Sequence, residues 1–520
     1  MKNEKIAFEN TKSFSSIFLD YLNEKPELKE FYGLFPNLSN FEEQIKLKSG
    51  TKTPRALVSK VLTEQYDDLV LSGKLLKNIN LLQKDETFTV TTGHQLNIFT
   101  GPVFFIYKIT TVINICRQLK EKYPQFDFVP VYWMASEDHD FLEINHFHLF
   151  GKEYTWDLEA KGAVGRLPTA GLKEILDQLP EKAEIFEESY LSQKNLAAAT
   201  RQIVNHLFGD EGMVVIDGDH PELKACFAEV MKDDLKHHEA YHKVAQSSEE
   251  LLKMGYKVQV NPREINLFYL TDENRLRLVK KDGEYEVLQS GLVFSKAEIH
   301  ELLDKRPECL SPNVVLRPLY QETLLPNLAY VGGPGEIAYW LQLKSTFDHY
   351  QVPYPILMPR NHALIINKSQ SQKIQKLQIN LEELFLDSYQ LKALFLKKHS
   401  DENLNLTQEK EFLTDIYETI LKKSKRVDGS LEGFVGSEKT KAIKMLDNVE
   451  KRLKKSEEKK QETSILQLSK LREKLFPQNS LQERKMNFLN FYLNNPGFLQ
   501  DIKNHFDPFD FRFNIITEDE

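Results

Sequence analysis

The residues best suited to chemistry in this chain lie next to one another, at Glu137, Asp138, His139 and Asp140. Carboxylates this close together can raise one another's pKa, and a carboxylate or an imidazole can take the proton of an attacking amine. We therefore predict that these four residues are catalytic. The alternative is that the acidic groups cap the next helix while His139 bonds locally.

A second polar stretch runs from Thr91 to Pro102, between a β-branched strand and a long apolar helix. A strand that turns through glycine into a helix directs backbone N–H groups and the helix dipole at one point, which attracts phosphate or carboxylate. We predict that His94 is catalytic and donates a hydrogen bond to a phosphate oxygen. The residues of this stretch predicted to bind the nucleotide are Thr92, Gly93, Gln95, Thr100 and Gly101.

A glycine-rich turn follows a later strand, where Gly332, Gly333 and Gly335 are predicted to bind the nucleotide, because glycine lets the backbone approach a ligand closely. A turn that only joins a strand to a helix is the alternative. Arginine forks around it suit carboxylate or phosphate, although structural ion pairs use the same residues. The predicted substrate-binding residues are Lys108, Asp217, Arg317, Glu336, Tyr339 and Arg360.

Histidines that follow the acidic stretch raise the question of a metal site. His146 and His148 lie near His139 and Asp140, but no distant ligand completes a set of the kind that zinc hydrolases use. Structural histidines are favoured, and no metal site is predicted beyond Mg²⁺ accompanying a nucleotide. The three cysteines lie far apart and form neither a disulfide framework nor a zinc cage: Cys116, Cys226 and Cys309.

Predicted strands precede all of these polar stretches and must position them. Strands alternate with helices, which predicts an α/β fold, a Rossmann-like doubly wound parallel sheet. In such sheets, ligands bind outside the carboxyl ends of the strands near a switch in strand order, so the polar strand ends are expected to share one crevice. The predicted strands are 87–91, 126–134, 213–216, 329–331 and 354–358, and a helix is predicted over 102–120 with Thr100 as its cap.

Three regions are expected along the chain. Residues 1–376 form the Rossmann-like core, with insertions at about 151–208 and 259–305 that include a hairpin at 153–168 and an antiparallel meander at 259–294. Residues 377–485 form a helical coiled-coil hairpin, and 486–520 pack back on the core. One arm of the hairpin, 437–475 with Ser437 as its cap, would reach ~58 Å at 1.5 Å per residue. A compact domain cannot cover such an arm, which predicts a homodimer through the coiled coil.

Composition narrows the class of protein. The 520 residues are 41% hydrophobic and 28% charged, as in ordinary globular proteins, and no apolar run approaches the ~20 residues that cross a bilayer. A secretory signal is not recognisable either, so a cytoplasmic protein without a membrane partner is expected. The net charge of -9 and the lack of a basic anticodon-binding module argue against nucleic-acid partners.

Five stretches together resemble one family, the cysteine ligases of bacillithiol biosynthesis: 92–102, 132–140, 215–219, 330–339 and 481–484. The resemblance covers essentially the whole chain and is most specific from Gly93 to Asp140. It implies a Rossmann-type core with a dimerising coiled coil, and a reaction that joins cysteine to the amine of glucosaminyl-malate. Many relatives carry Gln at the position of His94, which argues against a role that requires imidazole.

We therefore expect a ligase that forms an amide bond. Because amide formation from a free carboxylate is uphill in water, the carboxylate, that of cysteine, must be activated by ATP or ADP. The expected partners are the small molecules cysteine and glucosaminyl-malate. Two alternatives stay open, a nucleotidyltransferase acting on another amino sugar and a nucleotide-regulated coiled-coil scaffold.

Overall fold

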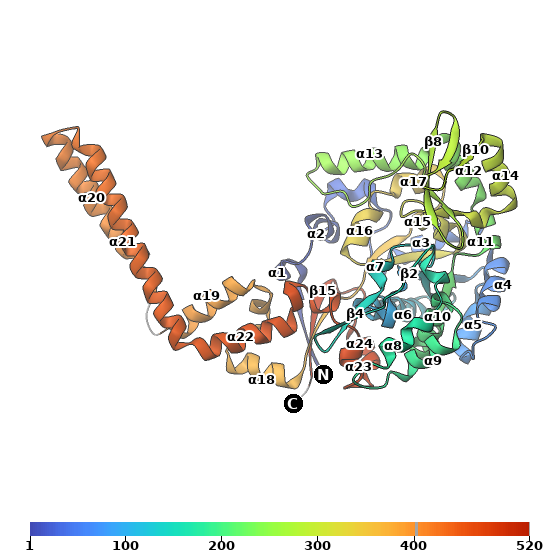
Figure 1. The fold of residues 1–520 in the computed structure, drawn as a ribbon, viewed down its shortest axis with the longest axis horizontal. Coiled ribbons are helices and arrows are strands. Elements are labelled where there is room, and N and C mark those ends of the chain that lie inside the picture. Colours follow the sequence, from blue (N-terminus) through green and yellow to red (C-terminus); the bar gives the residue numbers. More distant parts are fainter. Residues whose placement is uncertain (401–403, 519–520) are drawn as a thin grey trace.

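The computed structural model describes residues 1–400 and 404–518 and is built around a five-stranded parallel sheet (Figure 1). The order across the sheet is β13-β12-β2-β3-β6, so the chain moves outward from β2 on one side and then returns to its other side. This is a doubly wound, Rossmann-like order with its switch between β2 and β12, and the predicted fold class is confirmed. The strands are β2 (Thr87–His94), β3 (Asp127–Met134), β6 (Val214–Asp217), β12 (Asn327–Gly332) and β13 (Ile356–Pro359).

The central strands are buried on both faces, which explains their composition. β2 is rich in β-branched residues, and every residue except His94 is buried. Helix α6 (Phe104–Lys122) packs on β2 and β3, and thirteen of its nineteen residues are buried. A strand covered on both faces needs side chains that fill space without unpaired polar groups, and β-branched residues also fit its extended backbone.

The predicted start of α6 was wrong by two residues. The helix begins at Phe104, its N-cap is Val103, and Thr100 does not cap it. Thr100 and Gly101 have φ values of 65° and 62°, so the chain makes a left-handed turn before the helix can start. A β-branched residue adopts this conformation only when its surroundings impose it, and that is not readable from local sequence.

The first insertion contains a hairpin that lies upstream of the predicted 153–168. Strands β4 (His146–Leu149) and β5 (Lys152–Thr155) pair antiparallel. Their turn is at Phe150 and Gly151, both with positive φ, so the glycine sets the position of the hairpin. Helices α9 (Glu184–Ser192) and α10 (Leu196–Phe208) close this insertion.

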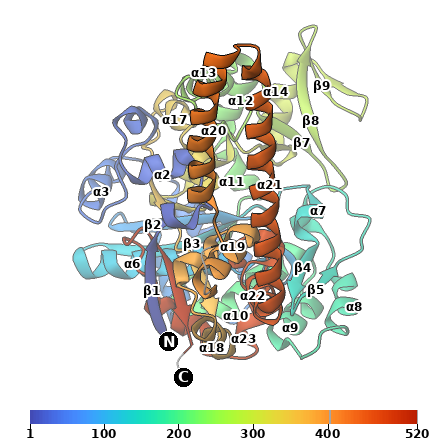
Figure 2. The same cartoon turned by 90° about the vertical axis from the view of Figure 1, so that its left-hand side faces the viewer.

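The second insertion is the predicted antiparallel meander, which is confirmed. Strands β7 (Leu267–Leu270), β8 (Arg275–Lys281), β9 (Glu284–Val287) and β10 (Leu292–Phe294) pair in sequence. After helix α14 (Lys296–Lys305), strand β11 (Leu310–Pro312) returns to pair with β7. This small sheet stands above the carboxyl ends of the central strands (Figures 1 and 2).

The two ends of the described chain meet in a third sheet. β1 (Lys2–Ala7) pairs antiparallel with β15 (Arg512–Thr517), which pairs parallel with β14 (Ala363–Ile366). Figure 1 shows both termini beside this sheet, where the long helices leave the globular part.

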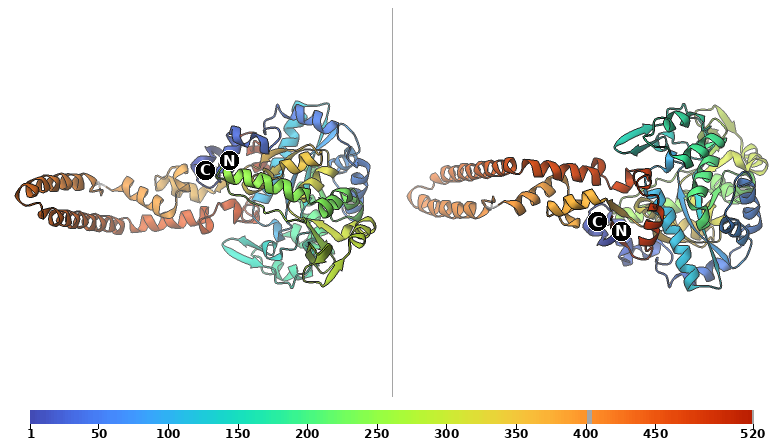
Figure 3. Two further views of the ribbon diagram at one scale, coloured as in Figure 1. Left: turned by 90° about the horizontal axis from the view of Figure 1, so that it is seen from above. Right: turned by 90° about the horizontal axis from the view of Figure 1, so that it is seen from below.

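The C-terminal helices form a hairpin that projects from the globular part (Figure 3). α20 (Thr407–Val427) and α21 (Leu431–Lys460) run side by side, and α21 alone spans ~45 Å at 1.5 Å per residue. The predicted single arm 437–475 was wrong. α21 starts after Ser430, so Ser437 lies inside it, and a break at Gln461 separates it from α22 (Glu462–Leu475). Leu468, Leu471 and Leu475 of α22 are buried, while the leucines of α21 are mostly exposed, so the chain bends where its surroundings change.

The remaining elements support these three parts. No helix among the described residues is long and apolar enough to span a membrane. The longer helices not yet named are α2 (Ser16–Leu22), α3 (Phe41–Ser49), α4 (Arg55–Gln65), α5 (Gly73–Leu81), α12 (Ala228–His237), α13 (Glu239–Lys253), α15 (Arg317–Leu324), α16 (Pro334–Trp340), α18 (Lys368–Lys376), α19 (Ser388–His399) and α24 (Phe498–His505).

Candidate functional site

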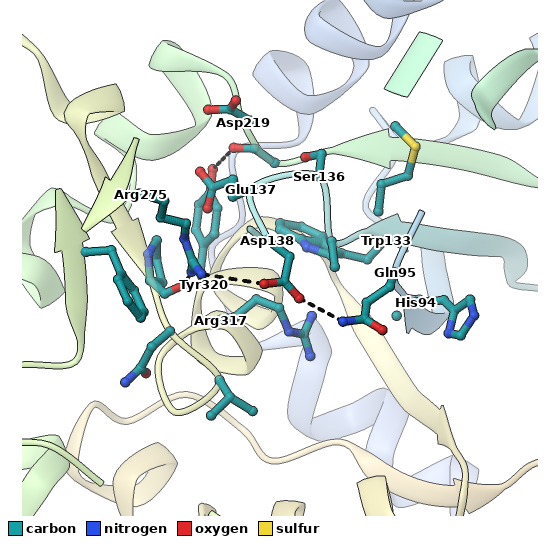
Figure 4. A pocket seen from close by; sticks show the side chains of 18 of the residues that line it. His94, Gln95, Trp133, Ser136, Glu137, Asp138, Asp219, Arg275, Arg317 and Tyr320 are labelled. Carbon is teal, nitrogen blue, oxygen red and sulfur yellow. Dashed lines mark hydrogen bonds and ion pairs between the residues drawn. The ribbon is translucent and has the colours of Figure 1, made fainter. Parts of the chain in front are cut away.

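A cavity of about 640 Å³ opens at the carboxyl ends of the central strands, beside the switch between β2 and β12. Its floor comes from the ends of β2, β3, β6 and β12, and its outer wall from the second insertion and the start of α15 (Figure 4). Eight of the predicted site residues line it: Gly93, His94, Gln95, Glu137, Asp138, Arg317, Glu336 and Tyr339. The crevice expected from the polar strand ends therefore exists, although only part of the predicted set faces it.

Glu137 sits in a buried charge cluster at the back of this cavity. One carboxylate oxygen forms an ion pair with Lys224, and the other accepts a hydrogen bond of 3.0 Å from Ser311. Lys224 also contacts Asp219 at 3.2 Å, and Arg166 donates to Asp219 at 2.9 Å. Burial raises the pKa of Glu137 above its ordinary value, although the neighbouring ammonium opposes that shift.

Lys224 stays charged in this cluster. Burial alone would lower the pKa of its ammonium, but the two carboxylates of Glu137 and Asp219 raise it overall. A carboxylate with a raised pKa beside a permanent cation is a suitable proton acceptor for an amine that enters the cavity.

Asp138 is held in its ionised form on the same strand end. Gln95 donates to one of its oxygens at 2.9 Å, and the backbone N–H of His139 donates to the other at 2.8 Å. Arg275 lies 3.8 Å away and stacks over Phe268. These hydrogen bonds and the guanidinium outweigh burial and lower the pKa of Asp138, so it acts as a fixed negative charge that orients Gln95 and Arg275.

An ion pair between a buried lysine and a partly exposed glutamate supports the floor below Gly93. The ammonium of Lys108 donates to the Gly93 carbonyl at 2.6 Å and contacts Glu336 at 2.7 Å. Glu336 also accepts hydrogen bonds from Tyr330 at 2.6 Å and from the Gly333 N–H at 2.9 Å. Lys108 lies behind the lining, so it supports the floor through its contacts and does not face the cavity.

Gly93 is required by close packing. A Cβ at this position would lie 3.2 Å from the Tyr330 hydroxyl and 3.5 Å from a nitrogen of Arg317. The contact with Tyr330 is tighter than an ordinary one, so a side chain here would crowd the tyrosine hydroxyl and leave no free space beside Arg317. The glycine therefore serves the approach of these side chains rather than a turn, because it lies inside β2.

His94 lines the cavity with a neutral ring. The imidazole stacks on Phe105 with ring centroids 5.0 Å apart, and burial followed by the nearby charge of Lys108 lowers its pKa to about 3. Its Nε2 atom is buried and has no hydrogen-bond partner among the described residues. A neutral imidazole can still donate one hydrogen bond, so this geometry is compatible with the predicted contact to a ligand oxygen.

The other predicted residues of the first strand end lie outside the cavity. The Thr92 hydroxyl donates to the Val331 carbonyl at 2.8 Å, between two strands of the sheet. Asn487, from the C-terminal segment, covers the turn at Thr100 and Gly101 and donates to the Gly101 carbonyl at 2.7 Å. Thr100 and Gly101 are therefore separated from the cavity that Gly93 lines.

His139 and Asp140 follow the cavity wall but do not line it. The imidazole of His139 lies 3.2 Å from Arg275, on the outside of the wall, and Asp140 is exposed at the start of α7 (Phe141–Ile144). Asp217 accepts a short hydrogen bond from Ser136 beneath the wall. It does not line the cavity, whereas the neighbouring Gly218 and Asp219 do. None of the three glycines at the end of β12 and just after it lines the cavity: Gly332, Gly333 and Gly335.

Arg360 belongs to a buried triad rather than to the cavity lining. Its guanidinium donates to Glu483 at 2.7 Å, and His362 lies 2.7 Å from the same carboxylate oxygen. All three side chains are at most 4% exposed. The triad joins the stretch after β13 to the segment that carries Glu483. Arg360 therefore takes part in a structural ion pair, which was the alternative to substrate binding.

The triad leads to a prediction for acid stability. Burial, and then the charge of Arg360, lower the pKa of His362 to about 4. A histidine in the unfolded chain takes up its proton near pH ~6.5. As the pH falls, the unfolded state is therefore protonated before the folded state. The stability that is present above pH ~6.5 is lost as the pH falls toward 4. We expect the thermal midpoint to fall over this window in wild-type protein and to fall less in His362→Gln, as calorimetry at pH 7, 6, 5 and 4 would show. Equal slopes would contradict this role of His362.

The wall contributed by the second insertion was missing from the predicted site. Arg263, Arg275 and Arg277 line the cavity, and among the described residues the guanidinium groups of Arg263 and Arg277 have no partner. The signal was present, because the alternation of Arg275-Leu276-Arg277-Leu278 places both arginines on one face of β8. That these arginines line this cavity follows only from the way the insertion folds back over the sheet.

A metal centre is not indicated by the side chains that the structure describes. In residues 1–400 and 404–518 no group of three or more His, Cys, Asp or Glu side chains is placed to hold a metal ion. The rings of His146 and His148 lie on one face of β4, and His148 pairs with Glu153 at 3.1 Å.

A charged cavity at the strand-order switch of a doubly wound sheet defines a Rossmann-like α/β protein whose ligand site lies at the usual place for this class. Residues 1–361 match the family described as the N-terminal Rossmann-like domain of BshC of bacillithiol biosynthesis, and residues 363–518 match its C-terminal coiled-coil domain. The chain belongs to this BshC family.

Individual relatives agree with this assignment. A protein of Flavobacterium psychrophilum named "Putative cysteine ligase BshC" is 44% identical over 95% of both chains. A relative of the same name from Flavobacterium johnsoniae is 42% identical over 99% of this chain and 100% of its own. Another from Chloroherpeton thalassium is 30% identical over 93% of both. The similarity therefore spans the core and the hairpin together.

Proposed function

We propose that this protein is a ligase that joins L-cysteine to the amine of glucosaminyl-malate and so forms bacillithiol, through a nucleotide-activated carboxylate. The observation that carries this proposal is the cavity at the β2–β12 switch, which combines a buried carboxylate, Glu137, with a wall of arginines in a chain of the BshC family. An amine substrate needs a proton acceptor, and a malyl carboxylate needs guanidinium groups.

The proposed reaction has two steps. The cysteine carboxylate attacks a phosphorus atom of ATP, which forms an acyl-adenylate or acyl-phosphate and releases pyrophosphate or ADP. The amine of glucosaminyl-malate then attacks the acyl carbon, its proton passes to Glu137, and AMP or phosphate leaves. The unpaired guanidinium groups of Arg263 and Arg277 suit the negative charge of such substrates.

The test is a reconstitution with purified protein. Cysteine, ATP and glucosaminyl-malate are expected to give bacillithiol, measured as its bimane derivative, together with stoichiometric AMP or ADP. A BshC relative assayed in parallel serves as the positive control. Product from the relative but none from this protein would refute the proposal, and nucleotide release with another amino sugar alone would favour the nucleotidyltransferase alternative.

We also propose that the protein is a homodimer joined through its helical hairpin. Three apolar side chains of α20 follow one another at four-residue spacing and are exposed: Phe412, Ile416 and Ile420. Met445 of α21 lies beside them, and together these helices form an apolar groove of about 440 Å³. Exposed apolar rows of this kind are covered in coiled-coil assemblies.

Two charges in this groove are expected to separate the subunits. The double variant Ile416→Glu/Met445→Glu would have to bury two carboxylates, so sedimentation equilibrium at micromolar concentration should change from dimer to monomer. Asp415→Asn, an exposed polar position on the same helix, is the control and should stay dimeric. A wild-type protein that sediments as a monomer would refute the proposed dimer.

A further inference from the structure

A buried carboxylate that does not itself line the cavity is bonded to the segment before β7. Asp234 of α12 has no solvent exposure, and both of its oxygens accept hydrogen bonds from the same residue. The backbone N–H of Asn266 donates at 2.6 Å, and the side-chain amide of Asn266 donates at 3.1 Å. A carboxylate that receives both bonds fixes the backbone and the side chain of Asn266 together.

Asn266 passes this constraint to two segments that line the cavity. Its side-chain amide donates to the Arg263 carbonyl at 2.8 Å, and its side-chain oxygen accepts the Arg263 N–H at 3.2 Å. The same oxygen accepts the side-chain amide of Asn313 at 3.0 Å, and the Asn266 carbonyl accepts the Asn313 N–H at 3.0 Å. One asparagine thus joins the loop before β7 to the loop after β11.

Asn313 extends the chain of bonds to the start of α15. Its side-chain oxygen accepts the Val315 N–H at 2.8 Å, and its carbonyl accepts the Arg317 N–H at 2.8 Å. Arg275 donates to the carbonyl of the adjacent Pro312 at 3.0 Å. Three of the four arginines that line the cavity, Arg263, Arg275 and Arg317, are therefore connected to Asp234 through at most three residues.

We propose that Asp234 and Asn266 are positioning residues, which hold the arginine wall in its binding geometry before an anionic substrate arrives. This inference rests on the proposed function only for the identity of that substrate. Loops that carry binding groups open easily unless hydrogen bonds restrain them, and a displacement of about 1 Å at a binding group weakens recognition strongly. A buried carboxylate with two bonds to one asparagine supplies such a restraint at the centre of both loops.

Hydrogen exchange tests the restraint without any ligand. In wild-type protein the amides of Asn266, Asn313 and Arg317 are expected to be protected, and in Asp234→Asn the peptides that cover 261–266 and 312–317 should exchange faster. The matched control is Asp233→Asn on the same helix. The Asp233 carboxylate accepts a hydrogen bond from Tyr350 and is not bonded to Asn266. Measurement at pH 8.5 keeps the carboxylate ionised, because burial raises the pKa of Asp234 to about 7.

Kinetics with glucosaminyl-malate test the consequence for binding. Asp234→Asn leaves one donor of Asn266 facing another donor. We therefore expect KM for this substrate to rise about tenfold, which is the size of effect of one lost buried hydrogen bond. The kcat should stay within about twofold of the wild-type value. The Asp233→Asn control should keep the wild-type KM. Asn266→Ser removes the side-chain amide bonds to Asp234, Arg263 and Asn313 but keeps the backbone bonds to Asp234 and Asn313, and it should behave like Asp234→Asn.

The outcomes separate this inference from the proposed function. Unprotected amides at Asn266 and Asn313 in the free wild-type protein would overturn it, even if neither variant folds. Variants with altered exchange but unchanged KM, or equal effects of Asp233→Asn and Asp234→Asn, would overturn it as well. A wild-type protein with protected loops that makes no bacillithiol would refute the proposed reaction and leave the restraint intact.

Discussion

Glu137→Gln is expected to lower kcat for bacillithiol formation by about 10²–10⁴-fold, the range measured when a general base is removed. The amide keeps the size of the side chain and can still accept from Ser311, and Lys224 keeps Asp219 as a partner. The fold should therefore survive while the proton acceptor is lost. The measurement is the steady-state rate with saturating cysteine, ATP and glucosaminyl-malate.

The pH profile sharpens this prediction. A general base works only when deprotonated, so the wild-type rate should rise with pH through the pKa of Glu137, which burial raises above the ordinary value for glutamate. In Glu137→Gln this acidic limb should disappear from what activity is left. Asp140→Asn is the comparison, because Asp140 is exposed outside the cavity and its loss should change the rate little. Equal losses of rate in the two variants would contradict the assignment of Glu137, inside the cavity, as the general base.

Glu483→Gln is expected to lower the free energy of unfolding by about 3–5 kcal/mol, as happens when one partner of a buried ion pair is removed. The substitution leaves the Arg360 guanidinium buried without a counter-charge, while His362 and the Ala363 N–H keep only a neutral acceptor. Urea unfolding followed by tryptophan fluorescence reports loss of the packed core, because Trp133, Trp156 and Trp340 are all buried.

A half-exposed ion pair supplies the control for this stability effect. Glu458 contacts Lys392 at 3.0 Å with both side chains more than a third exposed, so Glu458→Gln should change stability by at most about 1 kcal/mol. Burial alone would raise the pKa of Glu483, but the charge of Arg360 and the contact with His362 outweigh burial and lower this pKa below its ordinary value. The stability it provides is therefore present above the ordinary glutamate pKa and is lost as the pH falls below that value. A Glu483→Gln variant as stable as Glu458→Gln would contradict this account.

The central sheet could be predicted because its strands carry a local signal. Most of them are short runs rich in β-branched or aromatic residues that are followed by glycine or polar side chains, and the five predicted strands match β2, β3, β6, β12 and β13 to within a few residues. The expectation that the polar strand ends share one crevice then followed from the general rule for such sheets. The bend at Gln461 had no such signal, because it depends on where α22 meets the globular part.

The site could be predicted only in part, because sequence gives the end of a strand but not the direction of each side chain. Glu137 and Asp138 face the cavity while the adjacent His139 and Asp140 do not, since the chain turns toward α7 at that point. Lys224 and Arg275 come from an α-helix and an insertion distant in sequence, so only their folded positions place them beside Glu137 and Asp138.

The pairing of β1 with β15 has a consequence for synthesis of the chain on the ribosome. Residues 2–7 are made long before their hydrogen-bonding neighbour, residues 512–517. At roughly 5–20 residues per second the early strand waits on the order of half a minute to two minutes with an open edge. A nascent chain without residues 512–517 cannot complete this sheet, so β1 gains its antiparallel neighbour only when that segment has been made.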